Sequence, residues 1–432
     1  MCLKHWLNNT ACLLLVAFPL RLSAASPLDN WHVRNADASN TLTALTYGDG
    51  RFIAVDEVSI YQATPESPPS ALLISTNGKD WSRLPTGTNY FGTRGIASQN
   101  STIVVAAYAR LGPQLLRSQD AENWSGGLPT PLPRSVKAIN GRFVSAGWEF
   151  YQFCTESSGF ACGSSARLWY WYPSNVVAWW SAELSSLSSE ESFLGADMAY
   201  GNGTWVVIGW IGGDPFFNPF HPQTLVAWRS AGGTNYQRTV VAHLGLIPSL
   251  PSPYLNRPMS LAFGNGTFVA AVGLAKLFAS SDGITWTNRE PSSTQSWSAV
   301  TFGAGQFVAV GSPGVLLTSQ DGLAWTPRSS GTNASLSSIS YGNHSFVAAG
   351  EQVVLQSDPI HTLAIVNGSS PRLTLDGPTG SDYRIEATEN PTSTDSWQTV
   401  TNFLSVITPF DWADAEAPSS SRRFYRAVLI EP

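Results

Sequence analysis

Charge is scarce in this chain of 432 residues: only 12% of them are Asp, Glu, Lys or Arg, about half the usual share. The formal net charge is −6, so no basic surface is expected that would attract nucleic acid or an anionic membrane. Beyond the first 25 residues, no apolar run is long enough to cross a bilayer. The sequence therefore predicts neither a nucleic-acid partner nor a transmembrane segment.

Motifs for metal binding and for common catalytic chemistries are also missing. The six histidines are scattered, and His221 and His243 do not form a set of metal ligands. No Ser-His-Asp arrangement, phosphate-binding glycine loop or paired metal motif occurs in the sequence. We therefore expect neither a metal ion nor a cofactor. The oligomeric state stays open, and a monomer is compatible with the sequence.

The start of the chain has the features of a signal peptide. Lys4 and His5 lie in a short polar start, an apolar stretch runs from Ala11 to Leu20, and small residues precede a cleavage point near Ala25. We expect residues 1–25 to be removed. The mature protein would then be extracellular, periplasmic or attached to the cell surface.

Two cysteines remain after that cleavage, Cys154 and Cys162. In an oxidising compartment, a pair this close across one loop is expected to form a disulfide. Two free thiols are the alternative.

A repeated turn motif dominates the rest of the chain. Each copy contains an apolar strand, a turn rich in Gly or Asn, an aromatic residue and a second apolar strand. The clear copies are Tyr47-Gly-Asp-Gly-Arg-Phe52, Ile139-Asn-Gly-Arg-Phe143, Tyr200-Gly-Asn-Gly-Thr-Trp205, Phe263-Gly-Asn-Gly-Thr-Phe268, Phe302-Gly-Ala-Gly-Gln-Phe307 and Tyr341-Gly-Asn-His-Ser-Phe346, and a degenerate copy runs from Ile96 to Ile103. Such turns supply the positive φ that a tight hairpin requires. Seven repeats are therefore predicted.

A second motif follows most copies: a Ser, a few turn residues, and a Trp or Tyr six positions after the Ser. It occurs at Ser75–Trp81, Ser118–Trp124, Ser230–Tyr236, Ser280–Trp286 and Ser319–Trp325, with a weaker match at Ser174–Trp180. Within this turn the Asp can accept hydrogen bonds from backbone amides, and the Trp can pack between neighbouring sheets. Two hairpins per repeat give four strands, which is one blade of a β-propeller.

The seventh repeat is incomplete, because Pro359 follows Ser357-Asp358 and no fourth strand comes after it. Leu28-Asp-Asn-Trp31 aligns with Gly322-Leu-Ala-Trp325, and Trp31 precedes Phe52 by the same 21 residues that separate Trp325 from Phe346. We therefore expect the N-terminal segment to complete the last blade, which removes an open sheet edge. The predicted fold is all-β, with a seven-bladed propeller over residues 26–359.

Residues 360–432 have a different pattern. Short strands are expected at Leu363-Ala-Ile-Val, Arg372-Leu-Thr-Leu, Tyr383-Arg-Ile-Glu-Ala, Trp397-Gln-Thr-Val and Phe424-Tyr-Arg-Ala-Val-Leu. They predict a small antiparallel β-sandwich of the fibronectin type III sort. This tail is similar to C-terminal modules of large secreted bacterial proteins, and that similarity implies attachment or surface targeting.

The Ser-x-Asp-Gly-x-x-Trp turns resemble the Asp-box (BNR) repeats of sialidase-like propellers, with one residue fewer between Asp and Gly than the usual form. The resemblance covers residues 27–359 and implies the propeller fold. A sialidase also needs three arginines that bind a carboxylate, a Tyr nucleophile activated by a Glu, and an Asp acid. Arg34, Arg51 and Arg94 lack the expected Arg-Ile/Leu-Pro pattern, and Arg83, which is followed by Leu84-Pro85, comes after the Ser75–Trp81 turn. No sialidase catalytic residue is carried over.

Repeats one to four carry insertions between their second and third strands, and another insertion spans Val240 to Arg257. In a propeller both kinds of connection emerge on one face, opposite the Ser–Asp turns, and loops on a rigid scaffold commonly carry function. Their aromatic rings can stack on sugars or bind peptides. The candidate ligand-binding residues are Tyr61, Trp148, Tyr151, Trp169, Trp171, Trp210, Phe217 and His221. Packing of these rings against one another is the alternative.

Carboxylates near the second-strand ends, on the same side, give candidate acid–base groups: Asp56, Glu57, Glu149 and Asp214. Solvated loop acids or turn caps are the alternative. The sequence thus favours a secreted, non-catalytic binding or scaffold propeller that holds a glycan or an extracellular protein on the loop-bearing face of blades one to four. A glycoside hydrolase or lyase that uses these acids is the rival interpretation. An assembly factor for a membrane complex has no local support.

Overall fold

The structure is a computed structural model. It describes residues 26–34, 36–57, 70–85, 91–109, 112–128, 133–150, 164–171, 180–187, 192–212, 224–243, 259–273, 276–289, 295–366, 371–378, 381–393, 396–406, 408–415, 417 and 423–430. The described residues contain many β-strands and no α-helix, which confirms the all-β prediction. Among them there is also no helix of the length and hydropathy that crossing a membrane would require.

Seven sheets of the described chain have four antiparallel strands. In chain order they are β2 (Thr41–Gly48), β3 (Arg51–Glu57), β4 (Ala71–Ser75) and β5 (Ser82–Pro85); β6 (Phe91–Gln99), β7 (Thr102–Ala109), β8 (Gly112–Ser118) and β9 (Ser125–Leu128); β10 (Pro133–Ile139), β11 (Arg142–Phe150), β12 (Ser164–Trp171) and β13 (Trp180–Leu187); β14 (Ser192–Gly201), β15 (Thr204–Gly212), β16 (Thr224–Ser230) and β17 (Gln237–His243); β18 (Met259–Gly264), β19 (Thr267–Val272), β20 (Lys276–Ser280) and β21 (Thr287–Asn288); β22 (Ser296–Gly303), β23 (Gln306–Ser312), β24 (Leu316–Ser319) and β25 (Thr326–Arg328); and β26 (Leu336–Gly342), β27 (Ser345–Gly350) and β28 (Val354–Ser357) with β1 (Trp31–Arg34).

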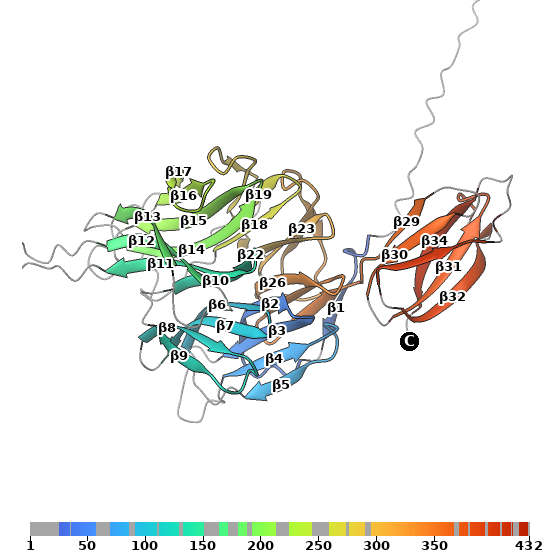
Figure 1. Cartoon of the computed structure of the whole chain (residues 1–432), viewed down its shortest axis with the longest axis horizontal. Coiled ribbons are helices and arrows are strands. Elements are labelled where there is room, and N and C mark those ends of the chain that lie inside the picture. Colours follow the sequence, from blue (N-terminus) through green and yellow to red (C-terminus); the bar gives the residue numbers. More distant parts are fainter. Residues whose placement is uncertain are drawn as a thin grey trace, which may run out of the picture.

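The first strand of each sheet contacts the first strand of the next, from β2 through β6, β10, β14, β18 and β22 to β26, and β26 contacts β2. These inner strands line a cavity of about 580 Å³. Apolar clusters fill the space between neighbouring sheets, and the repeated aromatics Phe52, Phe143, Phe268, Phe307 and Phe346 are fully buried there. Sheets packed face to face around a central cavity are the architecture of a β-propeller (Figure 1).

A glycine at the end of several inner strands lets the next sheet approach closely. A Cβ added to Gly264 would lie 2.1 Å from the ring of Phe302, and one added to Gly342 would lie 2.0 Å from the ring of Tyr47. The second contact joins β26 to β2, the last repeat to the first. The Gly in the turn motif is therefore required for packing between sheets as well as for the turn itself.

The Ser–Asp turns form the hydrogen bonds that the sequence predicts. In the turn that begins at Ser280, the Ser Oγ accepts from the N–H of Gly283 (2.8 Å), and Asp282 accepts from the N–H groups of Ile284 and Thr285 (both 2.8 Å). The indole N–H of Trp286 donates back to Gly283 O (3.3 Å). The Asp carboxylate thus accepts the hydrogen bonds that water would otherwise accept from the amides of the turn.

The last sheet contains a turn of this kind built from both ends of the described propeller segment. β1 lies antiparallel to β28, with Trp31 opposite Ser357. The Trp31 indole donates to Leu28 O (3.1 Å), which reproduces the Trp286–Gly283 bond. Asn30 Nδ2 donates to Asp358 Oδ2 (2.9 Å), so the Asp of the turn comes from one end of this segment and the Trp from the other.

The third sheet corrects the prediction of a turn at Ser174–Trp180. In other repeats a Ser stands opposite the buried aromatic, as Ser280 stands opposite Phe268. In this sheet Trp171 stands opposite Phe143, and Trp180 is already in β13, opposite Tyr170. The register therefore places Trp171, and not Ser174, at the position of the repeated Ser.

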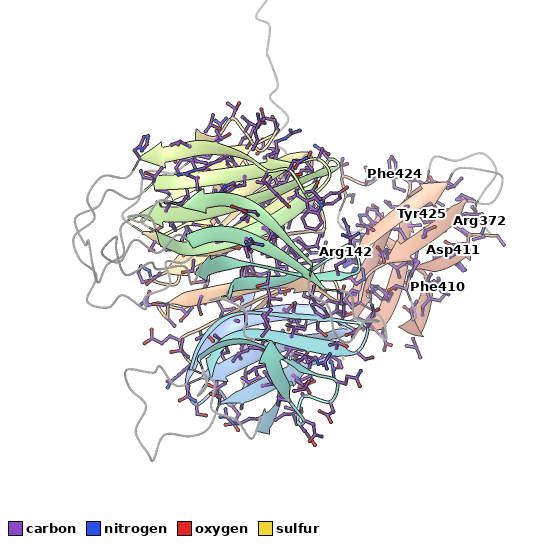
Figure 2. The ribbon with its side chains drawn as sticks, turned by 60° about the vertical axis from the view of Figure 1, so that its left-hand side comes forward. Arg142, Arg372, Phe410, Asp411, Phe424 and Tyr425 are labelled. Carbon is purple, nitrogen blue, oxygen red and sulfur yellow. The ribbon has the colours of Figure 1, made fainter. Side chains whose placement is uncertain are left out.

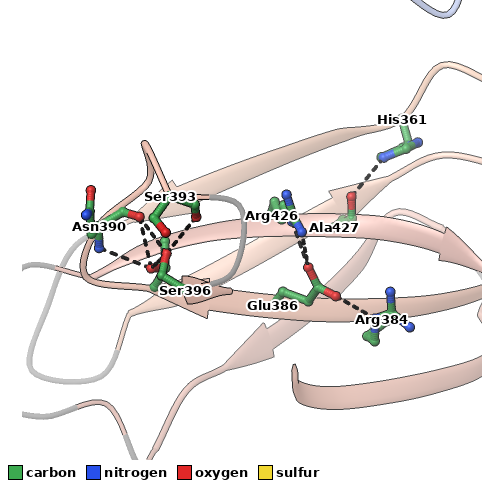
Figure 3. A network of polar contacts seen from close by, with 9 residues as sticks. His361, Arg384, Glu386, Asn390, Ser393, Ser396, Arg426 and Ala427 are labelled. Atoms are coloured by element: carbon green, nitrogen blue, oxygen red, sulfur yellow. Dashed lines mark hydrogen bonds and ion pairs between the residues drawn. The ribbon is translucent and has the colours of Figure 1, made fainter. Parts of the chain in front are cut away.

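Two three-stranded sheets follow the propeller (Figure 1), with orders β29 (Thr362–Val366), β30 (Arg372–Asp376), β33 (Phe410–Ala413) and β32 (Gln398–Val406), β31 (Ser381–Thr388), β34 (Phe424–Ile430). Leu375, Tyr383 and Val406 form their shared buried core. Figure 2 shows Arg372 and Tyr425 on the strands of these two sheets. In Figure 3, Glu386 lies between Arg384 and Arg426, each of which donates to it at 2.7 Å.

Acid should weaken the propeller through its Ser–Asp turns. The backbone N–H of Ala324, then that of Leu323, holds the pKa of Asp321 below its usual value, and the Asn123 amide does the same for Asp120. A carboxylate with a lower pKa in the folded state stabilises the fold above its unfolded pKa, and that contribution is lost as the pH falls. We expect the melting temperature to fall between about pH 5 and pH 2.

The Asp321→Asn variant is the matched test, because its amide cannot titrate. Melting curves across this pH range should show a smaller loss for the variant than for the unsubstituted chain. Equal losses would mean that the turn carboxylates do not contribute to acid unfolding.

Candidate functional site

Contacts between turns define the two faces of the propeller. Asn265, in the β18–β19 turn, donates to Gly305 O in the β22–β23 turn (3.2 Å) and to Gln320 O in the Ser–Asp turn of the same neighbouring sheet (2.8 Å). Both kinds of turn therefore lie on one face, here called the turn face. Because the strands are antiparallel, the connections from second to third strands and from one sheet to the next emerge on the opposite face, here called the rim.

The rim is extended in three consecutive sheets. The ladder between second and third strands ends at Val272–Lys276 in β19–β20 and at Val310–Leu316 in β23–β24. It continues further past the buried residue of the turn motif, which is Ile103 in β7 and an aromatic in β11 and β15. The last pairs there are Ala109–Gly112 in β7–β8, Phe150–Ser164 in β11–β12 and Ile211–Thr224 in β15–β16. The hairpins β7–β8, β11–β12 and β15–β16 therefore have longer paired strands on the rim side than β19–β20 and β23–β24 have.

Four of the eight predicted ligand-binding residues lie in described strands: Trp148, Trp169, Trp171 and Trp210. Trp148 and Glu149 lie near the rim end of β11, opposite Ala166 and Ser165, and Glu57 ends β3. The candidates that lie outside the described residues are Tyr61, Tyr151, Asp214, Phe217 and His221, together with Cys154 and Cys162.

Besides Trp148, three aromatic candidates lie in strands and not in loops. Trp210 is in β15, and its side chain is fully buried in a cluster with Phe268 and Phe278. It therefore stabilises the core and presents no face to a ligand. Trp169 and Trp171 belong to β12, opposite Ser145 and Phe143. β12 runs from the rim toward the turn face, so these two positions are at its far end.

Asp56 is a buried carboxylate with several donors. It accepts from the backbone N–H of Asn40 (2.9 Å) and of Ser39 (3.3 Å), and Arg83 forms an ion pair with it. The side chain of Asp56 has no exposed surface. These contacts attach the segment that precedes β2 to the first sheet, which is a structural role and does not fit a catalytic acid reached by substrate.

The central cavity contains a charged pair that our sequence interpretation did not single out. Positions six and eight before the buried aromatic, or before Ile103 in the second repeat, are occupied by Ala, Ser, Thr or Gly in every repeat except at Lys137 and Asp197. Small side chains fit there because the inner strands face one another across the cavity. Among the described residues that line the cavity, Lys137 and Asp197 are the charged ones.

This pair connects three sheets. Lys137 Nζ, on β10, donates to Asp197 Oδ2 on β14 (2.6 Å), to Met198 O (3.1 Å) and to Leu261 O on β18 (2.7 Å). Asp197 Oδ2 also accepts from the Leu261 N–H (2.7 Å). The ammonium group thus uses all three of its donors, and the pair links β10, β14 and β18 by hydrogen bonds.

One carboxylate oxygen of Asp197 accepts no hydrogen bond from the described residues. Its side chain is 5% exposed, and Oδ1 has no hydrogen-bond partner among the described residues. Ser135 Oγ and Thr43 Oγ1 are likewise buried without a partner, and both residues line the same cavity. Buried polar atoms normally have partners, so these three atoms are exceptions among the described residues near the cavity.

No family model matches the chain, and the search of curated proteins found no match. Solved structures of similar shape include YCF48 from Cyanidioschyzon merolae, 13% identical over 76% of this chain and 98% of that one, with a TM-score of 0.48. Sqt1 from Saccharomyces cerevisiae is 11% identical over 76% and 97%, with a TM-score of 0.43. An α-L-arabinanase from Penicillium chrysogenum is 16% identical over 64% and 91%, with a TM-score of 0.42. These similarities assign no function to the chain.

Proposed function

We propose that the seven four-stranded sheets are the blades of one closed ring over residues 26–359, with residues 360–432 as a separate sandwich of the fibronectin type III sort. The β1–β28 pairing and the contact of Gly342 with Tyr47 support closure. In this proposal residues 1–25 are a signal peptide, so the ring acts outside the cytoplasm.

We further propose that this ring is a non-catalytic binding or scaffold protein that holds a glycan or an extracellular protein at the rim. The observation that carries the proposal is the extension of the β7–β8, β11–β12 and β15–β16 ladders on that face. Paired strands hold their backbone in place, so they give the connections beyond them a rigid base. Rigid placement reduces the entropy that a binding loop loses when it meets a partner.

The test replaces residues 151–163 with an Asn-Gly turn. Phe150 and Ser164 are direct partners in the β11–β12 ladder, so a two-residue turn can close the hairpin without changing its register. Glycan arrays and binding assays with candidate extracellular proteins should find a ligand of the unsubstituted chain that the shortened chain holds at least roughly tenfold more weakly, a loss of about 1.4 kcal/mol.

Leu323→Ser is the matched control, because Leu323 is exposed on the turn face and should not affect such binding. A ligand that binds the shortened and unsubstituted chains equally would contradict a site at this rim. Turnover of chromogenic glycosides that is lost in Glu149→Gln would instead favour the hydrolase.

A further inference from the structure

The short connection between the propeller and the tail is bound at its start to the closing strand β1. Residues 358–361 are all that separates β28 from β29. Asp358 Oδ1 lies 2.6 Å from Nε2 of His32 in β1, and the Asp358 N–H donates to Asn30 O (3.3 Å). The first residue of the connection therefore also holds the segment that completes the last sheet.

The middle of the connection lies against the last sheet. The Ile360 N–H donates to the backbone oxygen of His344, in the β26–β27 turn (2.7 Å). The Ile360 side chain packs against the buried cluster that contains Leu28 and Phe346. The same turn also contacts the tail directly, since His344 Nε2 lies 3.7 Å from Asp376 Oδ1 at the end of β30.

The last residue of the connection is packed into the tail. His361 Nε2 donates to Ala427 O in β34 (3.1 Å), as Figure 3 shows. Its ring meets the Tyr383 ring edge-on, with 6.0 Å between the centroids. A Cβ added to Gly377 would lie 2.9 Å from His361 Cβ, so the end of β30 packs closely on this residue. The connection is thus fixed on the tail side as well as on the propeller side.

A connection of four residues with contacts on both sides cannot bend without breaking several hydrogen bonds, so its motion is restricted. We propose that residues 358–361 form a rigid joint that couples the tail to the closing strand: the docked tail stabilises β1 in the last sheet, and β1 stabilises the docked tail. Coupling of this kind is reciprocal, so a partner that orders the tail would also hold β1 in place. The inference rests on the proposed closure of the ring by β1.

Hydrogen exchange of the full chain, followed by mass spectrometry of its peptides, tests the joint in both directions. His361→Ala removes the hydrogen bond to β34, and the peptide that covers β1 should then exchange at least roughly threefold faster, the effect of one lost hydrogen bond. Asp358→Ala removes the side-chain contacts with β1, and β29 should exchange faster by a similar factor. Leu404→Ser, at a position 74% exposed in β32, is the control and should change neither peptide.

Two results would overturn the joint. The exchange of β1 is unchanged in His361→Ala, or β1 accelerates no more than β5, the outer strand of the first sheet, which would indicate a general loss of stability. Ring closure is judged separately, in the unsubstituted chain. If β1 exchanges there as fast as an unstructured peptide, closure itself is contradicted, whereas a protected β1 that ignores His361→Ala contradicts the coupling alone.

Discussion

Removal of residues 26–34 should destabilise the propeller by an amount comparable with its whole stability, on the order of 5 kcal/mol. Leu28 is 2% exposed in a cluster with Phe346 and Leu355, and burial of such a side chain alone contributes about 2–5 kcal/mol. The deletion also exposes the free edge of β28, which can pair with another chain. Chemical denaturation and light scattering should show a lower unfolding midpoint and concentration-dependent association.

Two single substitutions separate the contributions of this segment. Leu28→Ala should account for about 2–5 kcal/mol of the loss. Val33→Ala should change little, because Val33 is 61% exposed. A deletion variant that stays monomeric with an unchanged midpoint would show that the N-terminal strand is not part of the last blade.

Lys137→Met should be the most damaging single substitution in the cavity. It leaves the Asp197 carboxylate, 5% exposed, with the Leu261 N–H as its one remaining donor among the described residues. Loss of one partner from a buried pair costs about 3 kcal/mol or more, because the other charge stays desolvated. Equilibrium unfolding in urea should show that loss as a lower midpoint with an unchanged slope.

The double variant Lys137→Met with Asp197→Asn is the control for this interpretation. Removal of both charges should recover most of the lost stability, since a neutral amide is far cheaper to bury than an unpaired carboxylate. If the double variant is as unstable as Lys137→Met, the effect comes from packing and not from charge.

Much of the propeller could be predicted because its determinants are local. Each Ser–Asp turn forms its bonds within a few residues, as Asp282 does with Ile284 and Thr285, so the motif is visible in the sequence. The third repeat could not be aligned correctly from local motifs alone. It has Trp171 where other repeats have the turn Ser, and only the pairing of Trp171 with Phe143 gives its register.

The site was harder to predict because its residues interact across sheets. Lys137 and Asp197 are 60 residues apart, and nothing near either one indicates a partner. Alignment of the seven repeats does place both at positions otherwise held by small residues, which was the usable signal. Trp210 was predicted to bind a ligand because it stands next to an insertion in the sequence. In the structure β15 includes Trp210, and its side chain is buried in the core.

Closure of the ring is tested most directly by a cross-link between Trp31→Cys and Ser357→Cys, which are opposite each other in the β1–β28 pairing. The account predicts that mild oxidation joins the two peptides in one chain, as found by mass spectrometry without reduction. Ser319 is the control position, because it holds the equivalent place one sheet earlier. It stands opposite Phe307, and Ser357 stands beside Phe346 in the same way. A second variant carries Trp31→Cys with Ser319→Cys. A cross-link in this second variant and not in the first, or in neither variant, would contradict the closed ring.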